Sequence, residues 1–229
     1  MKPIVLSIMK QLARIIFRAL FGIFLFSIII VIAYRYIPIP ATPLMLTRYI
    51  QESEAINYEW TALKNINPEL VLAVVASEDN LFTEHNGFDF EAIKLAHDEA
   101  KSGKRLRGAS TISQQTAKNV FLWNGRSWLR KGLEAYFTIL IEIFWGKERI
   151  MEVYLNCIEM GKGIYGAKAV AKQHFKKSPD KLTRAECARI AATLPNPRRF
   201  NSAKPSKYIK SRERTILKFM KNIHKVEFK

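Results

Sequence analysis

Two glutamates stand where the surrounding sequence could tune a carboxyl group for acid–base chemistry, and the first is Glu78. It follows the segment LVLAVVA at residues 70–76, which is apolar on every face of a helix and is therefore expected to be buried. Burial and the negative end of the helix dipole both favour the neutral carboxyl, so they predict a raised pKa. Such a carboxyl suits general acid or base catalysis near neutral pH. The competing interpretation, a solvated cluster of acids at a helix end, is the simpler one on these residues alone.

A second segment, residues 108–119, combines hydroxyl, amide and ammonium groups with the start of a helix. Thr111 and Gln114 have the spacing of a capping box, and helix N-termini bind anions through their free N–H groups. Ser110, Gln114 and Lys118 are four residues apart, which predicts one polar stripe along a single helical face. Such a stripe could hold a sugar phosphate. An ordinary solvated face with a good cap is the alternative.

The second glutamate, Glu134, belongs to a charged cluster at the entrance to an apolar helix. Arg130 and Lys131 precede it by four and three residues, so the three are neighbours on a helix surface. The uncharged run at 135–141 predicts a helix that is buried or lies against lipid, where charges are costly unless paired or functional. A structural salt bridge is the alternative. Two such acids in a basic domain suggest sugar chemistry, but whether they share one cleft, in a hydrolase or a transferase, stays open.

These candidate groups follow a hydrophobic N-terminal segment that decides the compartment. Residues 19–34 carry no charge, and with residues 15–17 the segment reaches the roughly 20 residues needed to span a bilayer. The basic residues Lys2, Lys10 and Arg14 precede it, which predicts a cytoplasmic N-terminus and an external remainder. A cleaved signal peptide is disfavoured by the length of the run. We expect four parts: a cytoplasmic segment at 1–14, an anchor at 15–35, a proline-containing stalk at 36–60 and a folded domain at 61–229.

Charge and cysteine content narrow the range of partners. The chain has 37 Lys and Arg against 20 Asp and Glu, a formal net charge of +17. This excess suits an anionic partner, and an external domain makes anionic lipid or a phosphorylated substrate better candidates than nucleic acid. Cys157 and Cys187 lack the spacing of metal ligands, so we expect no metal site and buried free thiols. A disulfide between them stays open.

Helix start and stop signals recur beyond the stalk, whereas the sequence shows no sustained strand-like alternation. Asn67, Pro68 and Glu69 form a helix start, and Thr183 and Glu186 repeat the capping-box spacing. We therefore expect a mostly α-helical domain, with helices near 69–77, 89–102, 127–145, 147–156, 165–175, 184–194 and 206–223. His85 has no partner at metal-ligand spacing, so we expect a hydrogen-bonded structural histidine.

Four ordered segments make the chain resemble the peptidoglycan glycosyltransferases of glycosyltransferase family 51. Residues 78–89 read EDNLFTEHNGFD, and residues 108–119 read GASTISQQTAKN. Residues 130–134 read RKGLE, and residues 147–156 read KERIMEVYLN, where Met151 stands for the usual leucine. The resemblance extends to at least Phe200. The length of the chain leads us to expect a glycosyltransferase domain without a transpeptidase domain.

The resemblance implies a lysozyme-like α-helical fold with a small membrane-associated jaw, in a bacterial inner-membrane protein whose catalytic domain is periplasmic. The implied substrate is lipid II, a disaccharide-pentapeptide on undecaprenyl pyrophosphate, which is polymerised into β-1,4-linked glycan. The implied partners are the growing glycan strand, membrane lipid and other cell-wall synthesis and division proteins. The alternative functions are a lytic, lysozyme-like glycosidase and a non-enzymatic scaffold for anionic lipid.

The same resemblance implies roles for the candidate residues. Glu78 matches the general base that deprotonates the acceptor's sugar hydroxyl, and Glu134 matches a second acid near the pyrophosphate. The positions that match contacts to the donor's sugar and pyrophosphate are Ser110, Gln114, Lys118, Arg126, Arg130 and Lys131. Cations contribute most where negative charge develops on the leaving pyrophosphate. A divalent cation, Mg²⁺ or Mn²⁺, could assist there, although none is expected to be required and no carboxylate cluster marks a metal cage.

Overall fold

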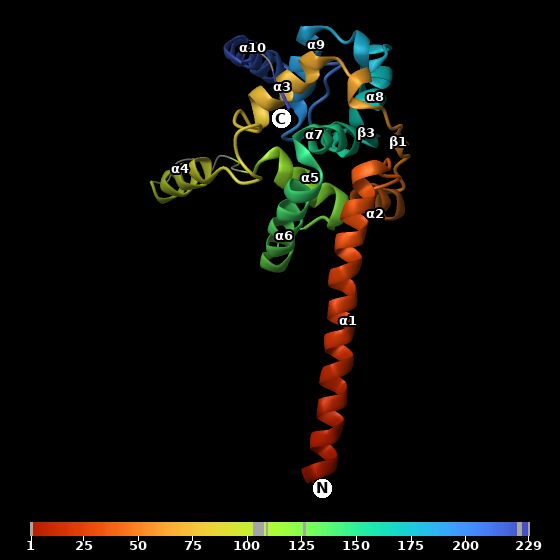
Figure 1. Ribbon diagram of the computed structural model, residues 1–229. Coiled ribbons are helices and arrows are strands. Elements are labelled where there is room, and N and C mark those ends of the chain that lie inside the picture. The colour runs from red at the N-terminus through yellow and green to blue at the C-terminus, as the bar shows by residue number, and fades with distance from the viewer. Residues whose placement is uncertain (1, 103–107, 109, 126, 224–225, 229) are drawn as a thin grey trace. The chain divides into compact units, whose positions relative to one another are not determined.

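The computed structural model describes residues 2–102, 108, 110–125, 127–223 and 226–228 (Figure 1). The protein divides into two compact units, Met1–Ile37 and Pro38–Lys229. The first unit is one long helix and the second is a helical domain. Arg126, one of the predicted substrate contacts, lies outside the described residues.

Helix α1 forms the N-terminal unit and runs from Lys2 to Tyr36. Its stretch Leu6–Tyr36 has 31 residues and reaches a mean hydropathy of 2.8. Because a helix rises about 1.5 Å per residue, this stretch exceeds the roughly 30 Å of a bilayer's hydrocarbon core. The helix is compatible with a single membrane anchor, and it begins earlier than the span predicted at 15–35.

A short helix, α2, lies within the region predicted as a stalk. It spans Pro43–Glu52, and the Thr42 hydroxyl oxygen accepts a hydrogen bond from the Met45 N–H at 3.3 Å. The sequence did not predict α2, because the closely spaced prolines before it indicate extended chain. Pro43 instead occupies the first turn, where its fixed φ and missing N–H are favourable.

Two groups of packed helices make up the second unit (Figure 1). In one group α9 packs against α3 and α10, and in the other α5 packs against α6 and α7. The segment between α3 and α5, which contains α4, joins the two groups. The bounds are α3 Pro68–Glu78, α4 Phe90–Lys101, α5 Ile112–Phe121, α6 Trp128–Phe144, α7 Gly146–Cys157, α8 Gly166–Val170, α9 Arg184–Thr193 and α10 Lys207–Asn222, with 3₁₀ turns at Leu63–Asn65 and Pro179–Lys181.

The prediction of a mostly α-helical fold is confirmed, and six of the seven predicted helices lie within one residue of their observed bounds. The side chains of Asn67, Thr111 and Thr183 cap α3, α5 and α9, as their spacing predicts. The prediction of a helix at 165–175 is confirmed as a helical segment, although only its first half is α-helical. Helix α8 ends at Val170, and the chain continues as a π-helical turn at Ala171–Phe175.

A small three-stranded sheet, in the order β1-β3-β2, was not predicted. Strand β1 (Asn57–Tyr58) runs parallel to β3 (Ile164–Tyr165), with Asn57 opposite Ile164. Strand β2 (Glu159–Gly161) runs antiparallel to β3. Strands of two or three residues are too short to show an alternating pattern in the sequence. The sheet ties the chain that follows α2 to the chain that follows α7.

Helix α3 is buried on every face, as its apolar sequence predicts. All residues from Leu70 to Ala76 are buried. A fully buried Leu or Val side chain contributes about 1.5–3 kcal/mol, so the helix is held firmly in the domain. This burial fixes the position of Glu78, the last residue of the helix.

Both cysteines are buried free thiols, as expected, and the disulfide that the sequence left open does not form. Burial raises the pKa of Cys157 and of Cys187 to about 12. Both thiols therefore stay protonated near neutral pH and pack as small apolar side chains.

The turn before α8 leaves no room for a side chain. Asn156 Oδ1 accepts a hydrogen bond from the Thr61 N–H at 2.8 Å, and its Nδ2 donates to the Thr61 carbonyl at 2.9 Å. Gly166, the first residue of α8, has φ of +79°. A Cβ there would come within 2.3 Å of the backbone carbonyl oxygen of Asn156. Because the obstacle is backbone, the position requires glycine.

We expect Gly166→Ala to lower the free energy of unfolding by roughly 2–4 kcal/mol, because it adds a backbone clash to the strain of a positive φ. Gly132→Ala, inside α6, is the matched control, since its Cβ would meet nothing within 4 Å. That change should stabilise the helix by about 0.5–1 kcal/mol. Urea unfolding in detergent, followed by circular dichroism, measures both. Equal stability of the two variants would contradict the packing at Gly166.

Candidate active site

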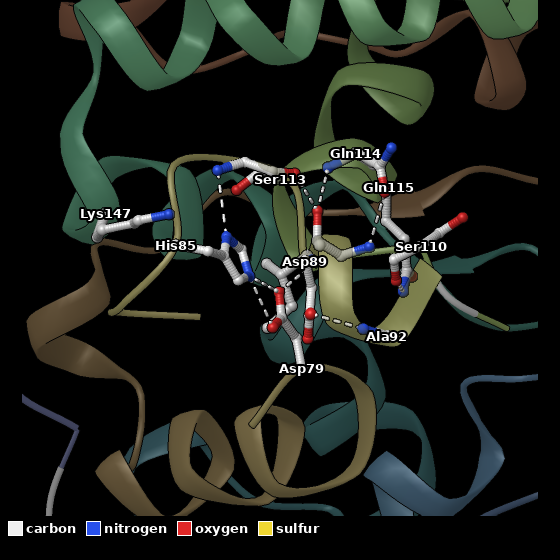
Figure 2. Close-up of polar contacts among 12 residues, drawn as sticks. Asp79, His85, Asp89, Ala92, Ser110, Ser113, Gln114, Gln115 and Lys147 are labelled. Carbon is white, nitrogen blue, oxygen red and sulfur yellow. Dashed lines mark hydrogen bonds and ion pairs between the residues drawn. The ribbon is translucent and has the colours of Figure 1, made fainter. Parts of the chain in front are cut away.

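Asp79, the residue that follows α3, connects the two helix groups through its buried carboxylate (Figure 2). Its Oδ2 accepts a hydrogen bond from the Ile112 N–H at 2.9 Å, in the first turn of α5. Its Oδ1 lies 2.9 Å from Nε2 of His85. The Gly87 N–H donates to Nδ1 of the same ring at 3.1 Å, so the ring proton lies on Nε2 and points at Asp79. The prediction of a structural histidine at position 85 is confirmed.

Helix α5 begins with its backbone groups already hydrogen bonded. The Gln114 N–H donates to the Thr111 hydroxyl oxygen at 3.2 Å, and the Thr111 N–H donates to Gln114 Oε1 at 3.0 Å. The Thr111 hydroxyl donates in turn to the Gly87 carbonyl at 2.7 Å. The prediction of free, anion-binding N–H groups is therefore wrong for Thr111, Ile112 and Gln114, because the protein's own oxygens occupy them.

The predicted polar stripe of Ser110, Gln114 and Lys118 does not form either. Ser110 precedes the helix, and Gln114 is buried with its Oε1 engaged in the cap. The prediction applied the four-residue helical spacing to Ser110, but the backbone is not yet helical at that residue. Figure 2 shows the consequence, because Gln115 lies beside Ser110 while Gln114 belongs to the cap.

Glu78 lines a cavity of about 460 Å³. Residues from α4 and its approach, from the start of α5 and from α10 complete the wall, among them Asp89, Ser110, Phe219 and Asn222. Burial raises the pKa of Glu78, as the sequence predicts, and the adjacent Asp79 carboxylate raises it further. A hydrogen bond from Gln115 and the charge of Arg212 on α10 offset part of this rise. The result is a carboxyl that takes up a proton more readily than an ordinary glutamate, as a general base requires.

Two residues that the sequence did not single out hold the Glu78 carboxylate. Gln115 Nε2 donates to Glu78 Oε2 at 3.1 Å, and the Tyr154 hydroxyl, from α7, donates to Gln115 Oε1 at 3.3 Å. The capping box was the available signal for Gln115. Because the capping box uses the side chain of Gln114, Gln115 is the glutamine whose side chain can reach Glu78 in the cavity.

Glu134 is buried in α6 and pairs with both cations predicted beside it. Arg130 Nη1 lies 2.7 Å from Glu134 Oε2, and Lys131 Nζ contacts Oε1. Arg130 Nε is buried and has no hydrogen-bond partner within the described ranges. Two cations thus share one carboxylate, and the group keeps a net positive charge.

Lys118 connects this cluster to Glu78 through its electrostatic environment. Burial lowers the pKa of Lys118, the charge of Glu134 raises it, Arg130 and Lys131 lower it, and Glu78 raises it. Both glutamates therefore lie near enough to Lys118 to act on its pKa, although the residues that line the Glu78 cavity include neither Lys118 nor Glu134. Three cations and one carboxylate at one place suit an anionic ligand group such as a pyrophosphate.

The part of the chain that the structure describes holds no group of three or more His, Cys, Asp or Glu side chains arranged for a metal ion. In the cationic cluster, the two carboxylate oxygens of Glu134 already form ion pairs with Arg130 and Lys131. These residues therefore do not fit a dedicated cage for a divalent cation, which takes several oxygen ligands.

Comparisons with known proteins agree with this chemistry. A family model described as Transglycosylase matches residues 45–221. A biosynthetic peptidoglycan transglycosylase of Bacteroides thetaiotaomicron is 55% identical over 221 residues, which cover 94% of this chain and 89% of the relative. Relatives of the same name are 51% identical in Caulobacter vibrioides, over 90% of each chain, and 46% identical in Pseudomonas putida, over 94% of this chain and 93% of the relative.

We expect Asp79→Asn to lower the free energy of unfolding by about 2–3 kcal/mol, because an amide is a weaker acceptor and brings its own N–H groups against two donors. Asp98→Asn is the control, since that carboxylate is exposed on α4, 3.7 Å from His97. Its effect should stay within about 0.5 kcal/mol. Urea unfolding followed by tryptophan fluorescence compares the two. Equal losses would mean that the buried Asp79 contacts do not stabilise the domain.

Proposed function

Because the chain belongs to the transglycosylase family and is a peptidoglycan transglycosylase, we propose that it polymerises lipid II with Glu78 as the general base. The observation that carries this proposal is a carboxyl group of raised pKa in a cavity, close enough to a cationic cluster to act on the pKa of Lys118. A base and a site for a leaving pyrophosphate are the two requirements of glycosyl transfer from a polyprenyl pyrophosphate.

In the proposed step, the 4-hydroxyl of the acceptor lipid II attacks the anomeric carbon of the growing strand. A new C–O bond forms while the hydroxyl proton passes to the Glu78 carboxylate. The bond between the anomeric carbon and the pyrophosphate oxygen breaks, and its electron pair leaves with undecaprenyl pyrophosphate. Attack on the face opposite the leaving group converts the α-linked donor into a β-1,4 linkage. Glu78 then releases its proton to solvent before the next cycle.

The cations Lys118, Arg130 and Lys131 are proposed to stabilise the charge that develops on the leaving pyrophosphate. Glu134 would hold Arg130 and Lys131 in place through the two ion pairs, so that they are oriented before the substrate arrives. Ser110, Gln114 and Arg126 are the further proposed contacts to the donor. A divalent cation would reach the site on the pyrophosphate oxygens, and we assign it no step.

We propose that α1 anchors the enzyme in the bacterial inner membrane, with the N-terminus cytoplasmic and the domain periplasmic. The basic residues Lys10 and Arg14 near the start of α1 support this orientation. A periplasmic domain would work beside membrane lipid and other cell-wall synthesis and division proteins, away from nucleic acid. Helix α6 supports contact with lipid, because its large apolar side chains are exposed at Trp128, Leu129, Ile139 and Ile143.

We expect Glu78→Gln to reduce lipid II turnover by about 10²–10⁴-fold, the usual contribution of a general base, without loss of folding. Glu69→Gln is the matched control at the other end of α3, where the carboxylate pairs with Arg184 at 2.9 Å. It should keep wild-type turnover. Consumption of fluorescent lipid II by the purified protein in detergent measures both. Wild-type turnover by Glu78→Gln contradicts the proposed role, and release of fragments from finished glycan would indicate a lytic enzyme instead.

We expect Lys118→Met to lower kcat by about 10²-fold with a smaller change in KM, because the ammonium acts mainly on charge that develops in the transition state. Lys210→Met, on the exposed face of α10, is the control for the loss of one positive charge. Steady-state rates over a range of lipid II concentrations separate the two constants. A rise in KM at constant kcat would place Lys118 in ground-state binding only.

A further inference from the structure

We propose that Tyr154 is a positioning residue that acts through Gln115 to keep Glu78 in the form that accepts a proton. This inference rests on the proposed function of Glu78 as the base. Two hydrogen bonds run in series, from the Tyr154 hydroxyl to Gln115 Oε1 at 3.3 Å and from Gln115 Nε2 to Glu78 Oε2 at 3.1 Å. Three helices meet in this chain of contacts, because Tyr154 lies on α7, Gln115 on α5 and Glu78 on α3.

The direction of the Gln115 amide decides which form of Glu78 is favoured. A carboxylate accepts a hydrogen bond from the NH₂ end of an amide, whereas a protonated carboxyl donates to the C=O end. The Ser110 carbonyl lies 3.5 Å from Gln115 Nε2, on the same side as Glu78. A reversed amide would bring Oε1 against that carbonyl and would lose the hydrogen bond that Oε1 accepts from the Tyr154 hydroxyl. The observed direction therefore favours the carboxylate.

Tyr154 can only act as a donor if its hydroxyl stays protonated, and its surroundings ensure this. The side chain is 1% exposed. Burial raises the pKa of Tyr154 well above its ordinary value, and the negative charges of Glu78 and Asp79 raise it further. The hydroxyl is therefore neutral over the whole range in which a carboxyl group titrates, and its hydrogen bond to Gln115 persists there.

Opposing influences act on the pKa of Glu78, and burial, which raises it, is the largest of them. Burial and the Asp79 carboxylate favour the neutral acid, while Gln115, Arg212 on α10 and Ser77 favour the carboxylate. Lys118 on α5 also acts across this region, since Glu78 affects its pKa. Loss of the directed amide would raise the pKa of Glu78. Activity that needs the carboxylate would then be lost at a higher pH as the solution is acidified.

The test is Tyr154→Phe, which removes only the hydroxyl oxygen. We expect kcat to fall about five- to tenfold, the value of one hydrogen bond. We also expect the acid limb of the pH–kcat profile to move up by about half to one pH unit. KM should stay near the wild-type value. Tyr165→Phe is the matched control, because that buried hydroxyl has no hydrogen-bond partner among the described residues, and its profile should match the wild type.

A double-mutant cycle shows whether the hydroxyl acts through the amide. Gln115→Met should move the acid limb upward by itself, and adding Tyr154→Phe to it should change neither kcat nor the limb further. An unmoved limb in Tyr154→Phe, or an equal loss of kcat in both backgrounds, overturns the proposal in favour of packing alone. If Tyr154→Phe does not fold, an unmoved limb in Gln115→Met overturns it. Glu78→Gln in the same assay separates the outcomes, because its retained turnover would refute the proposed base instead.

Discussion

The hydrogen bond from the Ile112 N–H to the Asp79 carboxylate is the contact on which the rest of the site depends. It fastens the end of α3 to the start of α5, and so brings two separately packed helix groups together at one point. A carboxylate at a helix N-terminus is favoured by the helix dipole. Burial makes the contact costly to lose, because the partners would be left without hydrogen bonds. Glu78 and Gln115 face each other because Asp79, next to Glu78, is joined here to Ile112, about one helical turn before Gln115.

Burial creates the reactive properties of the site, and the neighbouring charges keep them within a useful range. Burial and the Asp79 carboxylate raise the pKa of Glu78, while the hydrogen bond from Gln115 and the charge of Arg212 lower it. The cationic cluster has the opposite difficulty, since the Arg130 side chain is largely buried and its charge would be costly without a partner. Glu134 relieves it by pairing with Arg130 and Lys131, yet it neutralises only part of their charge. What remains is available to an anionic ligand group.

The sequence predicted the features that arise from neighbours within a few residues. The caps of α3, α5 and α9, the burial of α3 and the ion pairs of Glu134 all follow from local spacing, and the structure confirms them. Contacts between residues far apart in the sequence could not be predicted from local spacing. Gln115 meets Glu78 across 37 residues and Tyr154 across 39. The polar stripe failed for a local reason, because helical periodicity does not apply before the first turn.

Helix α5 carries two residues three positions apart: Gln115, which hydrogen bonds to the proposed base, and Lys118, which we propose faces the leaving group. Three residues of α-helix advance by about 4.5 Å. The helix therefore fixes the spacing between the backbone of the residue that holds the proposed base and the backbone of the proposed contact to the leaving group. Its length is set by backbone hydrogen bonds and does not vary with the motion of a loop. A molecule that blocks both places at once must reach from the side chain held by Gln115 to that of Lys118, two groups whose backbones α5 keeps at a constant spacing.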